Sequence, residues 1–97
     1  MKESTVLCDI IRLLERLKAQ ENQIWWVKIR KGPYQRSGLP DLHITWCGRS
    51  IWLEVKRPGK KATKLQRHIL EEIQKAGGYT GIVSSVEELR KFLDLHP

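Results

Sequence analysis

Apolar residues recur along this chain with two different spacings, and each spacing predicts a different kind of element. Across residues 4–20, STVLCDIIRLLERLKAQ, apolar side chains return every three or four positions, which places them on one face of a helix. The stretches TKLQRHILEEIQKAGG and SVEELRKFL are also predicted to be helical. Each begins with a capping-box pair, Thr63 with Gln66 in the first and Ser85 with Glu88 in the second.

Four shorter stretches are rich in β-branched and aromatic residues, which predicts strands. They are IWWVKIR at 24–30, LHITW at 42–46, SIWLEVK at 50–56 and YTGIVSS at 79–85. A turn around Cys47-Gly48-Arg49 joins the second strand to the third, whereas a helix separates the third from the fourth and predicts a parallel crossover. The expected order is αβββαβα, an α/β fold with a mixed central sheet flanked by helices. Because 97 residues are too few for two hydrophobic cores, residues 1–97 are expected to form a single domain.

The third predicted strand has two chemically different faces, because side chains alternate along a strand. The apolar face is expected to lie against the core and carries Ile51, Leu53 and Val55. The opposite face carries Trp52, Glu54 and Lys56, so the carboxylate and the ammonium project side by side.

A second acid, Asp41, follows the rigid Pro40 at the start of the preceding strand. If the two strands pair through their short turn, Asp41 comes close to Glu54 and Lys56. Carboxylate oxygens suit Mg²⁺ or Mn²⁺, and a nearby lysine can orient a water or stabilise charge on a phosphate. The pattern therefore indicates metal-assisted hydrolysis of a phosphodiester.

The charge of the chain favours the same class of substrate. Lys and Arg number 18 against 11 Asp and Glu, a formal net charge of +7, which favours a polyanionic partner such as nucleic acid. The loop from Lys31 to Leu39 is expected to close over substrate, with Tyr34 and Gln35 near its tip. The expected DNA contacts flank the acidic motif and are Arg30, Lys31, Tyr34, Gln35, Arg36, Arg57, Lys60, Lys61, Lys64 and Arg67.

The letters PD at 40–41 and EVK at 54–56 resemble the P-D…(D/E)-x-K signature of restriction-endonuclease-like nucleases. More narrowly, GLPDL, WLEVKRPG, TKLQ and AGGYTGIV resemble the virus-type replication-repair nuclease (VRR-NUC) domains of phages, bacteria and some eukaryotic repair nucleases. The resemblance covers nearly the whole chain. It implies a restriction-endonuclease-like fold and a Mg²⁺- or Mn²⁺-dependent deoxyribonuclease. It implies Asp41 and Glu54 as metal ligands together with the Val55 carbonyl, and it implies Lys56 as the catalytic lysine.

Two further site residues follow from the resemblance, each with an alternative. Families of this kind carry an acid on the first helix, where Glu3 is the best match and Glu15 the second. Glu3 is equally well explained as a favourable charge at a helix N-terminus. Gln66 falls where related nucleases keep a glutamine, so it is expected either to contact the site or only to cap its helix.

The resemblance also bears on assembly and substrate. Single-domain relatives are expected to pair as two-fold homodimers, similar to Holliday-junction resolvases, which implies a four-way junction or other branched DNA as substrate. The sequence offers a candidate dimer surface in the adjacent Trp25 and Trp26 and in Leu13 beside Leu14. The alternative is that these side chains fill the core of a monomer.

Other classes of site and location are less well supported. No apolar run approaches the roughly 18 residues of a membrane span, and no organic cofactor is expected. Two cysteines are too few for a disulfide framework, which favours a reducing cytoplasm. The family resemblance implies that this is the cytoplasm of a bacterial or phage-infected cell. The spacing of Cys8, Cys47, His43, His68 and His96 is not typical of zinc sites. Two rival functions remain, a catalytically silent DNA-binding module of the same fold and a basic protein-interaction domain.

Overall fold

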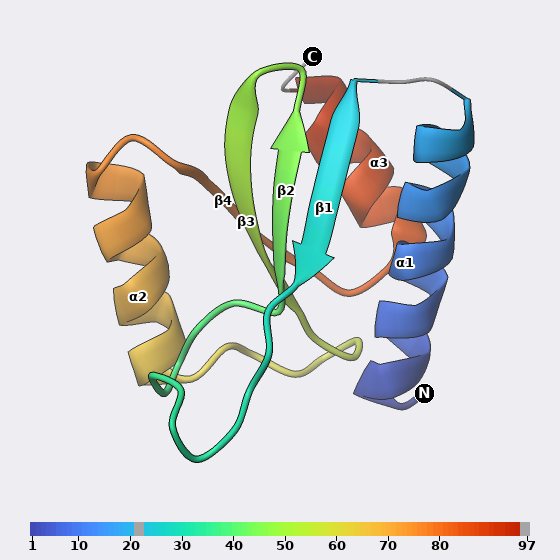
Figure 1. Cartoon of the computed structure of the whole chain (residues 1–97). Coiled ribbons are helices and arrows are strands. Elements are labelled where there is room, and N and C mark those ends of the chain that lie inside the picture. Colours follow the sequence, from blue (N-terminus) through green and yellow to red (C-terminus); the bar gives the residue numbers. More distant parts are fainter. Residues whose placement is uncertain (21–22, 96–97) are drawn as a thin grey trace.

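The computed structural model describes residues 1–20 and 23–95, which form seven elements in the predicted order αβββαβα (Figure 1). The helices are α1 (Glu3–Ala19), α2 (Lys64–Lys75) and α3 (Val86–Leu95). The strands are β1 (Ile24–Lys28), β2 (Leu42–Trp46), β3 (Arg49–Val55) and β4 (Tyr79–Val83). The expected element types are confirmed; β1 and β4 end two residues earlier than the residue pattern predicts.

The four strands form one mixed sheet in the order β1-β2-β3-β4. β1 pairs with β2 and β2 with β3 in antiparallel fashion, whereas β3 and β4 are parallel, as the crossover through α2 predicts. The β2–β3 turn has positive φ angles at Cys47 (50°) and Gly48 (82°), which match the twist of a two-residue hairpin. This hairpin sets the register that brings residues 41 and 54 together.

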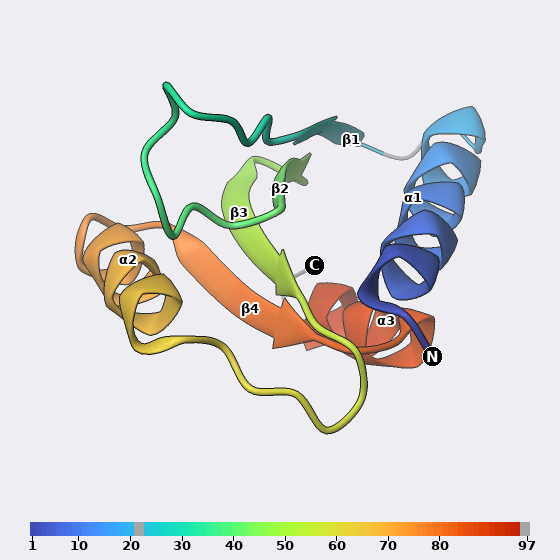
Figure 2. The same cartoon turned by 90° about the horizontal axis from the view of Figure 1, so that it is seen from below.

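Helices cover both faces of the sheet (Figure 2). α1 and α3 pack together on one face, and α2 lies on the other side beside β4. The core between the sheet and the α1–α3 layer is closed by side chains from both, and Ile10, Leu14, Ile44, Leu53 and Leu89 are fully buried in it.

Both predicted caps are present and fix where α2 and α3 begin. Thr63 Oγ1 accepts a hydrogen bond from the Gln66 amide, and the Gln66 side chain accepts one from the Thr63 amide, which completes the capping box of α2. Ser85 Oγ accepts from the Glu88 amide at the start of α3. These caps determine where the loops that precede the helices must end.

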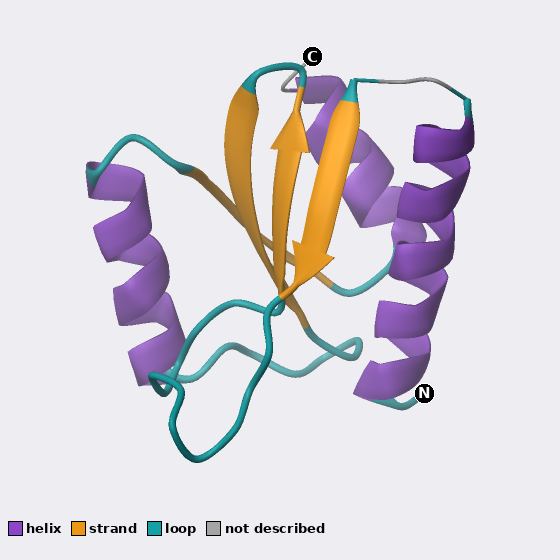
Figure 3. Ribbon diagram, viewed as in Figure 1, coloured by secondary structure: helices purple, strands orange, loops and turns teal. Residues whose placement is uncertain are grey.

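One end of the sheet collects the irregular segments of the chain. The loop between β1 and β2, the loop between β3 and α2 and the start of α1 all lie at this end (Figure 3). Pro40, Asp41 and Lys56 also lie at this end, at the ends of β2 and β3. The fold therefore brings the acidic motif and both basic loops to the same end.

The exposure of several side chains bears on the site and on the candidate dimer surface. Glu54 and Lys56 lie on the face opposite Leu53, yet they are only 2% and 5% exposed, because the central strand β3 is covered at this end as well. Leu13 was a candidate for the dimer surface but is 2% exposed and packs in the core. Trp25 is 54% exposed, whereas Trp26 packs against the core. None of the described helices is long and apolar enough to cross a membrane.

Candidate active site

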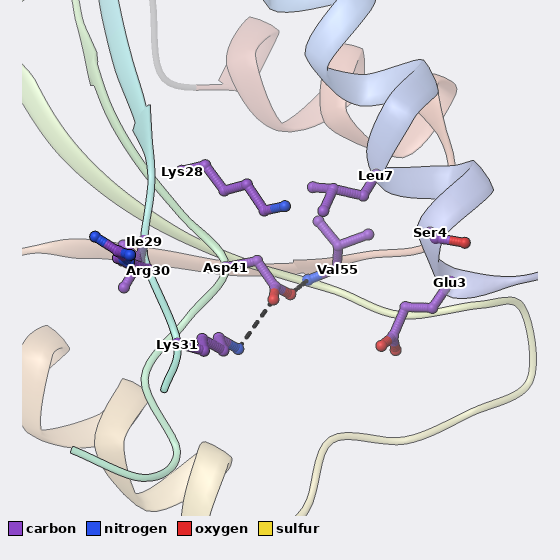
Figure 4. A pocket seen from close by; sticks show the side chains of 9 residues that line it. All are labelled: Glu3, Ser4, Leu7, Lys28, Ile29, Arg30, Lys31, Asp41 and Val55. Carbon is purple, nitrogen blue, oxygen red and sulfur yellow. Dashed lines mark hydrogen bonds and ion pairs between the residues drawn. The ribbon is translucent and has the colours of Figure 1, made fainter. Parts of the chain in front are cut away.

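A pocket of about 590 Å³ opens at this end of the sheet, between the start of α1 and the end of β1 (Figure 4). Figure 4 shows Asp41 near its middle, with Lys31 on one side and Glu3 on the other. The lining residues are Glu3, Ser4, Leu7, Lys28, Ile29, Arg30, Lys31, Asp41 and Val55. Five of these nine residues are charged. Glu3 comes from α1, and the other four come from β1, the loop after it and the start of β2: Lys28, Arg30, Lys31 and Asp41.

Asp41 is held in place by donors on both carboxylate oxygens. The Val55 amide donates to Oδ2 at 2.8 Å, and the Lys31 ammonium donates to Oδ1 at 3.0 Å. Its backbone is also fixed, because the Asp41 amide donates to the Leu53 carbonyl and the Asp41 carbonyl accepts from Ile29. The side chain is only 19% exposed and faces the pocket.

Glu54 lies next to Asp41, just beyond the Leu42–Leu53 pair of the hairpin, and the two side chains are hydrogen-bonded. Burial, followed by the hydrogen bond and the negative charge of Asp41, raises the pKa of Glu54 to about 8. The Glu54 carboxyl is therefore protonated at neutral pH and acts as the donor to Asp41. Among the residues that the structure describes, no group donates to the buried Glu54 Oε2.

The pKa of Asp41 moves in the opposite direction. Burial alone would raise the pKa of this carboxyl. Its hydrogen bonds with Glu54 and the Val55 amide, together with the Lys31 ammonium, outweigh burial and hold the pKa of Asp41 below its usual value. The two carboxyl groups thus share one proton and one negative charge, an arrangement that neighbouring acids adopt when both cannot ionise at once.

The predicted lysine is present at the site but is turned towards α1. Lys56 is nearly fully buried, and its Nζ lies 3.8 Å from Glu3 Oε1. The Lys56 ammonium is also close enough to Glu54 to act on its charge. Of the two acids on α1 that the sequence left open, Glu3 lines the pocket and faces Lys56. Glu15 is exposed and lies about 18 Å further along α1, at 1.5 Å per residue.

The donor set fits a hard divalent cation. No group of three His, Cys, Asp or Glu side chains that could bind a metal occurs within residues 1–20 and 23–95. Asp41 and Glu54 supply two carboxylates, and a strand residue directs its N–H and C=O to the same neighbouring strand. Because the Val55 N–H points to Asp41, its carbonyl points to that side as well. Two carboxylates and one carbonyl leave positions for water and phosphate, which Mg²⁺ typically keeps.

Gln66 is accounted for by the helix cap. Its side-chain oxygen accepts from the Thr63 amide at 2.8 Å, and Gln66 does not line the pocket that the described residues form. The expected DNA-contact residues are all exposed, and those with described partners hold the β1–β2 loop: Lys31 contacts Asp41, and Arg36 contacts Glu72 at 3.1 Å.

Two features were not expected from sequence. Lys31, which is expected to contact DNA, contacts Asp41 in this structure, and no spacing rule links residues 31 and 41 across an irregular loop. His43 stacks on Trp52 with ring centroids 3.9 Å apart, and both rings share Ser50 Oγ as hydrogen-bond partner. Burial lowers the pKa of His43, which keeps it neutral. Strand alternation and the hairpin register, which pairs residues 43 and 52, could have indicated the stacking of His43 on Trp52. His96 lies outside the described residues.

A scan against protein-family models found no match to this sequence, and a search of curated proteins likewise found none.

Proposed function

We propose that this protein is a metal-dependent deoxyribonuclease that hydrolyses phosphodiester bonds at the Asp41–Glu54 site. The observation that supports this most strongly is the buried carboxyl pair: Glu54 keeps its proton beside Asp41, and no group in the described part of the chain donates to Glu54 Oε2. Burying a carboxyl group that lacks a full set of hydrogen-bond partners lowers the stability of the folded protein. A role in stability therefore does not explain the presence of Glu54. Such perturbed acids are typical of functional sites.

A divalent cation would be held by Asp41, Glu54 and the Val55 carbonyl, with Mg²⁺ or Mn²⁺ as the metals that suit these ligands. When bound, it supplies a more acidic water and neutralises charge on the phosphate. Glu54 must lose its proton for this. Three hydrogen bonds between Asp41 and backbone groups, those with Leu53, Ile29 and Val55, keep the pair in place. Lys56 is positioned by Glu3 to orient a water or to stabilise charge on the phosphate.

We assign the fold to the restriction-endonuclease-like type and the chain to the virus-type replication-repair nucleases. An antiparallel β1–β2–β3 meander followed by a parallel β4 supports this assignment, as does the location of the acidic motif at one end of the β2–β3 hairpin. The sequence motifs PD and EVK carry the family assignment. The assignment is further supported by the position of both motifs at one end of the sheet, where Asp41 and Val55 line the pocket.

DNA is the proposed substrate because exposed cations surround the site. The β1–β2 loop and the β3–α2 loop carry them, and both loops end at the pocket side of the sheet (Figure 3). Tyr34 is 98% exposed at the tip of the first loop, in a turn in which Gln35 N–H donates to the Gly32 carbonyl. An aromatic side chain at that tip can stack on an unpaired base, which favours branched DNA over plain duplex.

Incubation with labelled duplexes, flaps and four-way junctions in Mg²⁺, Mn²⁺ or EDTA tests the proposal. We expect cleavage that EDTA abolishes and that falls by at least about 100-fold in Asp41→Asn, Glu54→Gln and Lys56→Ala, because these remove metal ligands or transition-state charge. Circular dichroism of each variant controls for folding. Salt-sensitive binding without cleavage would indicate a silent DNA-binding module instead, and the absence of both would indicate a protein-interaction domain.

A further inference from the structure

We propose that Lys31 exchanges between two anions: it holds Asp41 in the metal-free protein and transfers to a DNA phosphate when a divalent cation binds Asp41. This inference rests on the proposed metal-dependent nuclease function. It gives Lys31 a role that the P-D…(D/E)-x-K motif does not contain, because the motif lysine is Lys56.

The two carboxylate oxygens of Asp41 differ in how easily their hydrogen-bond donors can be displaced. Oδ2 is bound by the Val55 amide, a backbone donor within β3 that cannot move without breaking the sheet. Oδ1 is bound by the Lys31 ammonium at the end of a flexible side chain. A cation that binds Asp41 is therefore expected to compete with Lys31 rather than with Val55.

The Lys31 ammonium and a divalent cation would repel each other if both were bound to Asp41 Oδ1. Lys31 Nζ lies 3.0 Å from Oδ1, and a Mg²⁺ ligand distance is about 2.1 Å, so both cations would be within a few ångströms of each other. Their repulsion is strong in a partly buried site. Release of Lys31 removes that repulsion and leaves one unpaired positive charge at the pocket.

The surroundings of the two lysines support different roles. The side chain of Lys56 is 6% exposed and is held by Glu3. The side chain of Lys31 is 47% exposed and starts from the basic β1–β2 loop. This loop is anchored further along by the Arg36–Glu72 ion pair and by close packing of Gly38 on Leu65. Lys31 can therefore leave Asp41 by a side-chain rotation alone.

The first test measures metal affinity without DNA. Mn²⁺ binding is followed by calorimetry for wild type, Lys31→Ala and Lys31→Arg, with Lys28→Ala as the matched control. Lys28 also lines the pocket, but its loss removes only a nearby charge. We expect Lys31→Ala to bind Mn²⁺ about two- to fivefold tighter, the value of one exposed ion pair. Lys28→Ala should change less, and Lys31→Arg should bind no tighter than wild type.

The second test measures DNA binding to a duplex with Ca²⁺ or EDTA, using the slope of log K against log salt. With Ca²⁺, the Lys31→Ala slope should be smaller than that of wild type by about one unit, the value of one phosphate contact. In EDTA the two slopes should agree, because Asp41 then holds Lys31. A difference of one unit in both conditions would mean that Lys31 contacts DNA regardless of metal and would overturn the exchange.

Failure of the inference and failure of the proposed function give different results. Wild-type protein that binds no Mn²⁺ and cuts no DNA would contradict the nuclease function itself. Wild-type protein that binds Mn²⁺ and cuts DNA, with equal or weaker Mn²⁺ affinity in Lys31→Ala, would overturn only the exchange, because Lys31 would then support metal binding or be irrelevant to it.

Discussion

At the scale of single residues, the carboxyl of Glu54 determines how the metal-free protein responds to pH. Its pKa is raised to about 8 in the folded protein, above the ordinary value of 4.5. The folded state therefore binds more protons than the unfolded state between these values, and stability falls as pH rises through this window. Above pH 8 the pair carries two negative charges, which a bound cation would offset.

We expect urea unfolding in EDTA to show lower stability at pH 9 than at pH 6, and Glu54→Gln to lose most of this difference because glutamine does not titrate. Added Mn²⁺ should restore stability at pH 9, since binding to the folded state alone is stabilising. Asp41 does not contribute in this window, because its lowered pKa affects stability only in acid. An unchanged pH dependence in Glu54→Gln would contradict the shared proton.

The acid on α1 can be identified by a matched pair of substitutions. Glu3→Gln removes the negative charge that faces Lys56 at 3.8 Å, so we expect cleavage to fall by about tenfold through loss of positioning. Glu15→Gln changes an acid of the same helix far from the pocket and should leave cleavage within about twofold. Single-turnover rates at saturating Mg²⁺ measure both. An equal loss of cleavage rate in Glu15→Gln would contradict the assignment of Glu3 as the acid of the site.

Part of this site could be predicted from sequence, and the reason differs for each residue. The convergence of Asp41 and Glu54 follows from strand alternation and a two-residue turn, both local rules. The burial of Glu54 could not be predicted, because it depends on how β4 and the helices cover β3. The Lys31 contact depends on the path of an irregular loop, which no periodicity describes.

At the scale of elements, α2 shows how a local signal and a family resemblance can assign one residue differently. The pattern of Thr63 and Gln66 predicted a capping box, and the structure confirms both of its hydrogen bonds. Gln66 also falls where the nucleases that the sequence resembles keep a glutamine. Helix and strand order was predictable because periodicity, caps and glycine turns agree. The end of β1 was not, because Ile29 continues its β-branched composition beyond the last strand residue, Lys28.

The role of Gln66 can be tested by removing each half of the cap. Thr63→Ala and Gln66→Ala should each lower the free energy of unfolding by about 1 kcal/mol, the usual value of a lost helix cap. Neither should change the cleavage rate of the folded protein by more than about twofold. Urea unfolding and single-turnover cleavage at low temperature measure the two effects. Loss of cleavage in Gln66→Ala but not in Thr63→Ala would indicate that the Gln66 side chain acts at the active site.

At the scale of the whole molecule, the exposed side of the edge strand β1 is the surface at which we expect a second copy to bind. Trp25 is 54% and Val27 40% exposed on it, whereas α2 covers the β4 side of the same face. Leu13 and Trp26 pack in or against the core, so Trp25 remains as the exposed residue of the dimer surface expected from sequence. Two-fold pairing through β1 would place two pockets on one assembly, as cleavage of both strands of a four-way junction requires.

We therefore expect a homodimer that depends on Trp25. Light scattering at tens of micromolar should give twice the 11.4 kDa mass of the chain, and Trp25→Glu should give the monomer, because it places a charge where an aromatic side chain is buried between copies. Ile82→Glu is the matched control, since Ile82 is 42% exposed on the other edge strand and should leave the dimer intact. A monomeric wild type would remove the dimer and the paired cuts across a junction, but would leave the single-site chemistry of Asp41 and Glu54 unaffected.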